Sequence, residues 1–535
     1  ESTKAGLLDG SSLGSSNPAC QPSREEGVDK MRMAMMLNNV STSMSPKTAA
    51  RGDMGHRPKG SSLSHFQNFM STTDTIHVGF DYNASAFMDG MLRQSLGVGR
   101  NHASNDWTSS FDEGLSLSIE NQIRMYSLSD GSDMIRGGSS AAIVTMIATW
   151  LSNRDNKQQH KVGVQSAIAL ICCHERVMPS TDLMLLITRT YMKRDGKHSE
   201  GCIAMLTLWL QHYSGDFVDV KGNPTELHHR LREFTQALVA DYRGGELPAA
   251  CAALVANTAS VVAAPSGENK PINTTCVLAG DGKMLRQHFD FIDLHPREVA
   301  VQLTRIDHEF FQSVPRHELV ARQWTLRDSA CQRLINRFNR LSGWAASEIL
   351  TTPSVKQRVE VLKRFILCAS FCWELHNING MMAIVSALGC HPVARLKKTW
   401  KLVSPKYVSM LQRLESHIRF QDNVKEYRRL QRQCLQSGEF FLPMFAVITR
   451  DLTFIYDGNT DHLDDMHTIN FDKIYLAGCL IHDAIQLQHV PFVYPETTVR
   501  AEKVYKYLQR LANTFSDDIL YEMSLRLEPR SVDLV

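Results

Sequence analysis

The sequence predicts an all-α fold made of two helical domains, the second of which is a helical bundle with a protruding helical hairpin. Two observations support this. Apolar residues recur at intervals of three and four over long stretches, which is the spacing of one helix face, and alternating strand-like patterns are scarce in the second half. With 535 residues, 43% of them hydrophobic and 21% charged, the chain is globular and too long for one ordinary core.

The first 105 residues have a different texture from the rest. They are rich in Ser, Gly, Asn and Met, and neither a helical nor a strand period persists there. Such a segment has too few apolar residues to bury a core. Residues 1–105 are therefore predicted to be a disordered tail.

A first helical domain is predicted over residues 125–245. Apolar residues step at helical spacing through 143–151, 168–172 and 183–187, and another helix runs through 203–210. Such periodicity indicates helices that bury one face against one another.

Residues 246–290 are predicted to be a linker, because Pro265, Gly267 and Pro271 interrupt any regular element. The segment 247–263 at its start is apolar, but it consists mostly of Ala and small polar residues. It is not expected to span a membrane.

A second helical domain is predicted over residues 291–530. Pro296 is well placed in the first turn of its opening helix. In residues 358–375 apolar side chains occupy nearly the whole circumference, which is typical of a central helix of a bundle.

A hairpin is predicted from two later segments. The first arm ends with DLTFIYDGN, residues 451–459, in which Thr453 and Asp457 are four apart and share a helical face. Gly458 offers the left-handed position at which such a helix stops. The return arm is predicted to cover 469–488.

Bulk properties exclude several classes of protein. The formal net charge of +2 gives no indication of a nucleic-acid partner. Most of the 12 cysteines lie inside apolar helical patterns, and no C-x-x-C pair has zinc-ribbon spacing, which favours a reducing, cytoplasmic compartment. There is no G-x-x-x-x-G-K-[ST] and no Gly-rich strand-to-helix turn, so we expect neither a GTPase nor a protein with a cofactor or small-molecule substrate of its own.

The segment HLDDMH offers candidate metal ligands at His462, Asp464, Asp465 and His467. A metal-dependent hydrolase is the least favoured interpretation, because these residues sit in the hairpin loop and lack H-E-x-x-H spacing. No metal site is predicted.

Several segments of the second half resemble, in the same order, the catalytic domain of Ras-family guanine-nucleotide exchange factors, the all-helical domain of Son of sevenless and its relatives. These segments are residues 294–324, 337–350, 358–388, 395–404, 451–459 and 469–473. The first helical domain is similar, more loosely, to the Ras exchanger motif that usually precedes that domain. This second match rests on Gly137-Gly138, residues 166–191 and TLWLQHYSGDF at 207–217.

The resemblance implies a guanine-nucleotide exchange factor, which promotes GDP release from a Ras, Rap or Ral type GTPase without covalent chemistry. In this family the hairpin pries the nucleotide site open and displaces the magnesium. By resemblance, Leu452 and Thr453 would obstruct the metal site. Asp457 would compete for the GTPase's phosphate-loop hydroxyl and lysine, and Asn459 would close the arm.

The resemblance also implies a wider contact surface for the GTPase. An exposed Tyr beside an Arg is typical of a binding hot spot, two asparagines match the family's Asn-Phe-Asn motif, and a basic strip could meet an acidic GTPase surface or membrane headgroups, so membrane recruitment is expected. The contact residues implied in this way are Tyr427, Arg428, Asn377, Asn379, Arg395 and Lys398.

Four positions depart from the family pattern. Gly389 stands where Asn is common, Asp457 replaces the more common Glu, Ile474-Tyr475 replace a basic pair, and Thr460 replaces Pro. Each touches the working surface, so a catalytically silent scaffold that binds GTPases or adaptors is the alternative. The first helical domain is expected to brace the hairpin, with a regulatory GTPase surface as the alternative role.

Overall fold

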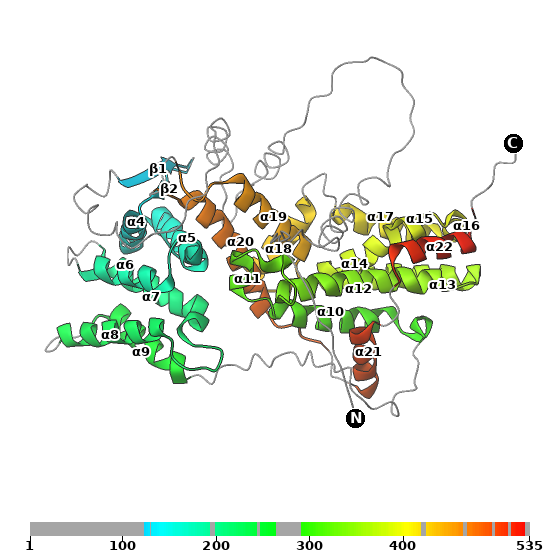
Figure 1. The fold of residues 1–535 in the computed structure, drawn as a ribbon, viewed down its shortest axis with the longest axis horizontal. Helices are drawn as coiled ribbons and strands as arrows, with labels where there is room; N and C mark the ends of the chain where they lie inside the picture. The colour runs from blue at the N-terminus through cyan, green and yellow to red at the C-terminus, as the bar shows by residue number, and fades with distance from the viewer. Residues whose placement is uncertain are drawn as a thin grey trace, which may run out of the picture. The chain divides into compact units, whose positions relative to one another are not determined.

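The computed structural model of this protein is all-α among the residues that it describes, apart from one small sheet (Figure 1). The predicted tail, residues 1–105, lies outside the described residues. All described residues belong to one compact unit within residues 50–535. The described ranges are 122–128, 130–192, 198–242, 247–263, 290–418, 424–463, 468–494, 498–511 and 515–529.

The N-terminal half of the described chain forms a sheet edge and a group of packed helices. A three-stranded antiparallel sheet has the order β1-β2-β3, and its third strand comes from the distant hairpin loop. The elements are β1 (Ile123–Ser127), β2 (Asp133–Gly138), α4 (Ser140–Ser152), α5 (Lys157–Cys173), η2 (His174–Arg176), α6 (Ser180–Met192), α7 (Ser199–Tyr213), η3 (Ser214–Phe217), α8 (Glu226–Asp241) and α9 (Ala249–Ala263).

The glycine pair of β2 allows the hairpin loop to join this sheet. Gly137 pairs with Asn470 of β3 (Ile469–Asn470), and Gly138 pairs with Ile469. A Cβ atom on Gly137 would run into the backbone of Ile469, so a larger residue would push the strands apart.

Helix α9 corrects the predicted linker, which was placed over residues 246–290. Ala has the highest helix propensity, and Cys251, Leu254 and Thr258 follow one another at intervals of three and four on a buried face. Through this face α9 packs against α7 and α8. The prolines named for this linker follow the helix in the sequence and lie outside the described residues. No helix in the described ranges is long and apolar enough to cross a membrane.

The C-terminal half is a bundle of helices followed by the hairpin. Its elements are η4 (Phe291–Asp293), α10 (Pro296–Gln312), α11 (Arg316–Val320), η5 (Gln323–Thr325), α12 (Ala330–Leu350), α13 (Val355–Glu374), α14 (Ile378–Gly389), α15 (His391–Ala394), α16 (Lys397–Lys401), α17 (Pro405–His417), α18 (Lys425–Ser437), α19 (Phe445–Gly458), α20 (Phe471–His489), α21 (Val499–Arg510) and α22 (Asp517–Leu527).

The bundle core lies between α10, α12, α13 and α14. Phe291 stacks on Phe365 with ring centroids 4.1 Å apart, and Trp344 meets Phe365 edge-on at 5.3 Å. The predicted central helix is α13, but α14 is buried still more completely, from Ile378 to Leu388. Beside it, Asp307 and Arg337 form a buried ion pair of 3.1 Å.

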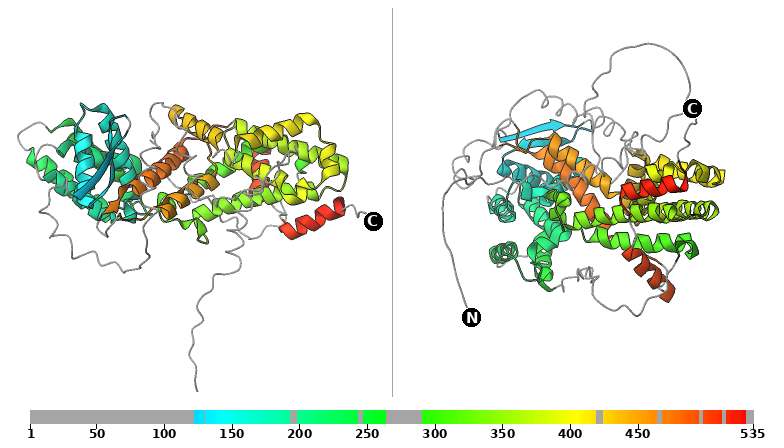
Figure 2. Two further views of the ribbon diagram at one scale, coloured as in Figure 1. Left: turned by 90° about the horizontal axis from the view of Figure 1, so that it is seen from above. Right: turned by 45° about the vertical axis from the view of Figure 1, so that its right-hand side comes forward.

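Helices α19 and α20 form the predicted hairpin, whose two arms are antiparallel because the start of α20 lies beside the end of α19. The hairpin does not protrude freely, since α20 also packs along α5 of the N-terminal group. The orange helices α19 and α20 lie between the cyan-to-green helices and the yellow-green bundle (Figure 2). Helix α20 is thus covered on both sides, whereas α19 retains an open face.

Candidate functional site

Side-chain caps hold both ends of α19. At its start, the Oδ1 atom of Asn379 accepts a hydrogen bond from the backbone N–H of Phe445 at 3.4 Å. At its end, the Nδ2 atom of Asn459 donates to the carbonyl of Ile455 at 2.8 Å. The prediction of a left-handed Gly458 is wrong, because the φ of Gly458 is not positive. The chain leaves the helix through an extended Asn459, whose amide supplies the cap.

One face of α19 is open to solvent over its last turns. Asp457 and Phe454 are exposed, Phe454 by 43%, and Thr453, one turn before Asp457, is half-buried. Leu452, which was expected to face a partner, is fully buried because it lies one turn from Ile448 on the inner face. Phe454 was missed, although the inner face defined by these apolar residues places it on the outer side.

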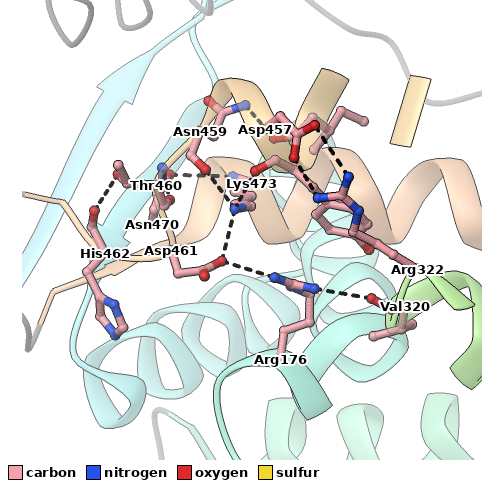
Figure 3. A network of polar contacts seen from close by, with 12 residues as sticks. Arg176, Val320, Arg322, Asp457, Asn459, Thr460, Asp461, His462, Asn470 and Lys473 are labelled. Atoms are coloured by element: carbon pink, nitrogen blue, oxygen red, sulfur yellow. Dashed lines mark hydrogen bonds and ion pairs between the residues drawn. The ribbon is translucent and has the colours of Figure 1, made fainter. Parts of the chain in front are cut away.

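The Asp457 carboxylate meets a guanidinium from another part of the chain (Figure 3). The Nη1 atom of Arg322 lies 2.5 Å from Oδ1, and its Nη2 atom donates to Oδ2 at 3.3 Å. Arg322 follows α11 with a left-handed backbone, φ 59°, and its guanidinium lies 6.0 Å from the ring of Trp324 and 5.8 Å from that of Tyr456. The Asp457 side chain is still 59% exposed.

A buried lysine fastens the end of α19 to the start of α20. The Nζ atom of Lys473 donates to the carbonyls of Tyr456 and Asn459, at 2.9 and 2.6 Å, and pairs with Asp461 at 2.9 Å. Burial lowers the pKa of Lys473 despite this partner. Burial would raise the pKa of Asp461, but Lys473 and Arg176 outweigh it and lower that pKa. Sequence reasoning missed Lys473, although it stands in the recognised INFDK segment.

Arg176 connects this end of the hairpin to the N-terminal helices. It lies in η2, just after α5, and its guanidinium sits 4.4 Å from the ring centre of Tyr456. It donates to the carbonyl of Val320 at 3.3 Å and pairs with Asp461 at 3.4 Å (Figure 3). The segment η2, the end of α11 and the loop of the hairpin therefore meet beside the last turn of α19.

Residues 298–475, from α10 to the start of α20, match the RasGEF domain family. The chain contains a RasGEF domain. It is 33% identical over 248 residues to Ras guanine nucleotide exchange factor M of Dictyostelium discoideum, covering 45% of this chain and 26% of that protein. It is 29% identical over 245 residues to Ras-specific guanine nucleotide-releasing factor 2 of Rattus norvegicus, covering 45% and 20%. The chain matches about a quarter or less of the length of these relatives.

Two of the predicted contact residues of the RasGEF domain lie on α18. Tyr427 was expected to be exposed, but it is fully buried, with its ring 5.7 Å from that of Phe441, and burial raises its pKa. This prediction is wrong because Tyr427 belongs to the narrow apolar face of α18. Arg428 is partly exposed and pairs with Asp451 of α19 at 2.7 Å.

The two predicted asparagine contacts are also internal. Asn377 caps α14 by accepting from the N–H of Gly380 at 2.8 Å and donates to Thr304 and Asp307, each at 3.2 Å. Asn379 is 4% exposed and caps the start of α19. Both were expected on the contact surface, but in this RasGEF domain they are buried and cap the starts of α14 and α19.

The remaining predicted contacts, Arg395 and Lys398, lie at α15 and α16. Arg395 donates to the carbonyl of Ser524 at 2.6 Å. The backbone N–H of Lys398 donates to Glu528 at 2.9 Å, while its side chain is exposed. The C-terminal end of α22 thus holds in place the basic strip formed by Arg395, Lys397, Lys398 and Lys401.

The departures from the family pattern have different consequences. A side chain at Gly389 would meet no atom within 4 Å. Ile474 and Tyr475 are buried, and the Tyr475 hydroxyl donates to Gln165 of α5 at 3.1 Å, so apolar packing on the N-terminal helices replaces a basic pair. Thr460 is exposed, and its hydroxyl donates to the carbonyl of His462 at 2.5 Å.

In the described part of the chain, one group of side chains has the spacing of metal ligands: His376, Cys434 and Glu439, with ligand atoms within 4.8 Å. The Nδ1 atom of His376 lies 3.0 Å from the carbonyl oxygen of Phe440 and 3.6 Å from the Sγ atom of Cys434, and Glu439 is exposed, so contacts within the protein account for this group. Of the HLDDMH segment, His462 pairs with β3 through an isolated bridge, and residues 464–467 lie outside the described residues. We assign no metal role to either group.

Proposed function

We propose that this protein is a guanine-nucleotide exchange factor that promotes GDP release from a Ras-family GTPase. The observation that carries the proposal is the exposed last turn of α19 in a RasGEF domain, with Asp457 and Phe454 facing outward from a firmly held hairpin. The relatives' names as Ras exchange or releasing factors support the same activity.

The proposed mechanism needs no covalent step. Nanomolar to picomolar affinity of a GTPase for its nucleotide corresponds to a binding free energy of roughly 12 to 16 kcal/mol, so spontaneous release is slow. A protein that binds the empty GTPase better than the occupied one weakens nucleotide binding by the same factor, because the coupling of two ligands is reciprocal. An inserted hairpin that occupies the magnesium and phosphate positions would provide this antagonism.

The outer face of α19 supplies the groups that this insertion needs. The Asp457 carboxylate would accept hydrogen bonds from a phosphate-loop hydroxyl and lysine in place of the phosphate. Thr453 and Phe454 would fill the space of the metal. Leu452 faces inward and supports the helix instead, and Asn459 closes it.

The helices of residues 133–263 are proposed to act as a Ras exchanger motif-like brace for the hairpin. Their contact with α20 is made by α5 along much of its length. From the other side, Arg316 at the start of α11 donates to the carbonyl of Cys172 at 2.6 Å and pairs with Asp216 at 2.8 Å. Such a brace would keep α19 rigid, so that binding energy is not lost in bending it.

The test is nucleotide release from Ras, Rap and Ral proteins loaded with a fluorescent GDP analogue. The full chain is expected to accelerate release from at least one of them, and Asp457→Asn to reduce this acceleration by about tenfold or more, as for loss of a charge-assisted contact. Asp155→Asn, which changes an exposed carboxylate in the connection between α4 and α5, is the matched control. If no GTPase in the panel is accelerated, the proposal is wrong, and binding without release would identify a scaffold.

Recruitment to membranes is a second part of the proposal. The side chains of Lys397, Lys398 and Lys401 are exposed around α16, and Leu402 beside them is 60% exposed. Each lysine near an anionic lipid surface contributes about 1 kcal/mol. Co-sedimentation with phosphatidylserine vesicles is expected to exceed that with phosphatidylcholine vesicles, and to fall when the three lysines become Glu. Equal binding to both vesicle types would contradict recruitment by this strip.

A further inference from the structure

We propose that Arg322 is a positioning residue that holds the Asp457 carboxylate in the orientation presented to the GTPase. This inference rests on the proposed function, because it assigns a role to the group that supports the α19 carboxylate. The family resemblance did not point to Arg322. It comes from the loop between α11 and η5, 135 residues away from Asp457 in the sequence.

The geometry of the pair fixes the plane of the carboxylate. Both terminal nitrogens of Arg322 engage Asp457, one on each oxygen, at 2.5 and 3.3 Å. A planar guanidinium that makes two near-parallel contacts orients a carboxylate, which a single ammonium contact does not do. Asp457 thus has one preferred rotamer at the exposed turn.

Arg322 is itself held in place. The backbone N–H groups of Ala321 and Arg322 donate to the carbonyls of His317 and Leu319 in the turn that ends α11, at 2.8 and 3.4 Å. The backbone of Arg322 is left-handed, a conformation that costs a non-glycine residue energy and persists where the surroundings require it. The ring of Trp324 flanks the guanidinium. The cation therefore belongs to a rigid corner of the RasGEF domain.

The pair also compensates an unfavourable location of the carboxylate. Asp457 is the second-last residue of α19, at the negative end of the helix dipole, where a carboxylate is disfavoured. The adjacent cation offsets this repulsion. Without it, the carboxylate is expected to turn away from the end of the helix.

The contact with Arg322 leaves Asp457 available to a partner. A carboxylate has about four lone-pair sites, and the guanidinium uses two of them. With 59% of the side chain exposed, the carboxylate remains accessible to a partner. A pair as exposed as this changes an equilibrium by at most about fivefold, which is too little to withhold the carboxylate but enough to orient it.

The experiment measures GDP release from a responsive GTPase over a range of concentrations of the full chain. Arg322→Gln is expected to lower the maximal release rate about two- to fivefold, with the half-saturating concentration and the unfolding temperature nearly unchanged. Arg322→Lys is expected to recover part of the rate. Arg230→Gln, which removes an exposed arginine paired with Glu226 on α8, is the matched control and is expected to behave as wild type.

A double-mutant cycle separates positioning from a purely structural role. In an Asp457→Asn background, Arg322→Gln is expected to cause no further loss of rate. An equal loss in both backgrounds would overturn the inference, as would a wild-type or faster rate in the single Arg322→Gln variant. Release by the wild-type chain with no effect of Arg322→Gln refutes the positioning role alone, whereas no release by the wild-type chain refutes the proposed function as well.

Discussion

The two arms of the hairpin differ sharply in how they are buried. Helix α20 is covered on nearly all sides, by α19, α5, α10, α11 and β2. Helix α19 buries one face and leaves Thr453, Phe454 and Asp457 toward solvent at its end. The difference teaches that the two arms are suited to different roles: under the proposed function, α20 would anchor the hairpin and α19 would present the side chains that contact a GTPase.

The two arms also use charge differently. On α20, Lys473 is 5% exposed and uses its charge inside the molecule, on two carbonyls and Asp461. On α19, Asp457 keeps its charge at the surface with one partner. Buried ion pairs cost desolvation and mainly fix geometry, while exposed ones are worth little and leave the group free to exchange partners. Changes in α20 should therefore affect stability, and changes on the outer face of α19 should affect nucleotide release.

The largest expected effect comes from closing the contact between α20 and α5. Gly478 lies against the backbone of Ala169, and a Cβ atom at Gly478 would be 2.5 Å from its carbonyl oxygen and 2.6 Å from its Cα. Backbone atoms cannot move aside without separating the helices. Gly478→Ala is expected to lower the free energy of unfolding by about 3 kcal/mol, as measured by urea denaturation.

The control for this substitution is Gly389→Ala, since a Cβ atom at Gly389 meets nothing within 4 Å. It is expected to change stability by less than about 0.5 kcal/mol. If Gly478→Ala were as stable as the control, the role of α20 as the anchored arm would be wrong.

Acidification should weaken the same anchor. Burial, followed by the nearby His212 and His489, lowers the pKa of His482 on α20 to about 3, and its Nδ1 atom lies 2.9 Å from the hydroxyl of Tyr213 on α7. The unfolded chain takes up this proton near pH 6.5 and the folded one only near pH 3. Stability is therefore full above pH 6.5 and falls as the pH drops from 6.5 toward 3.

The measurement is urea unfolding at pH 7 and pH 5. Between these values the wild-type chain is expected to lose about 2 kcal/mol more than His482→Asn, whose amide oxygen retains an acceptor near Nδ1 but does not titrate. An identical pH dependence in both proteins would mean that His482 is not kept neutral by the packing of α20.

The sequence was informative about single helices, but less so about how those helices pack against distant parts of the chain. The periodicity of residues 358–375 and the segment 451–459 predicted helices where α13 and α19 lie, because these signals are contained within one element. Which of Leu452 and Phe454 points outward depends on how α19 is rotated against the bundle. That rotation is fixed by helices far away in the sequence.

Two arginines that sequence reasoning missed, Arg322 and Arg176, have partners that are distant in the chain. Arg322 and Asp457 are separated by 135 residues, and Arg176 and Asp461 by 285. No spacing rule links such positions. The buried Tyr427 shows the converse: a Tyr beside an Arg suggests a hot spot, but its exposure was decided by the packing of α18 on Phe441. Helix α9 was missed because the later prolines were given more weight than its Ala-rich periodicity.

A smaller effect, confined to function, is expected on the presenting arm. Phe454 is 43% exposed, so Phe454→Ala removes little buried area and should leave stability unchanged. If this ring fills the metal position of the GTPase, its loss should raise the half-saturating concentration for release about tenfold. Phe515→Ala, at another exposed aromatic position (37%), is the control. A shift of the same size in both variants would remove Phe454 from the working surface.

The smallest expected effect tests whether the presented surface extends beyond α19. Gly389 ends α14 where the resembled family commonly has Asn, and the space around it is open, with no positive φ that would strain another residue. Gly389→Asn therefore fits without a clash and offers a GTPase one more amide. A net hydrogen bond is worth about 1 kcal/mol, so nucleotide release at limiting exchange factor should rise a few-fold, with unchanged unfolding temperature. Gly389→Ala, which fills the space without the amide, is expected to leave release at the wild-type rate. If Gly389→Asn does the same, the contact surface does not include the end of α14, and α19 presents alone.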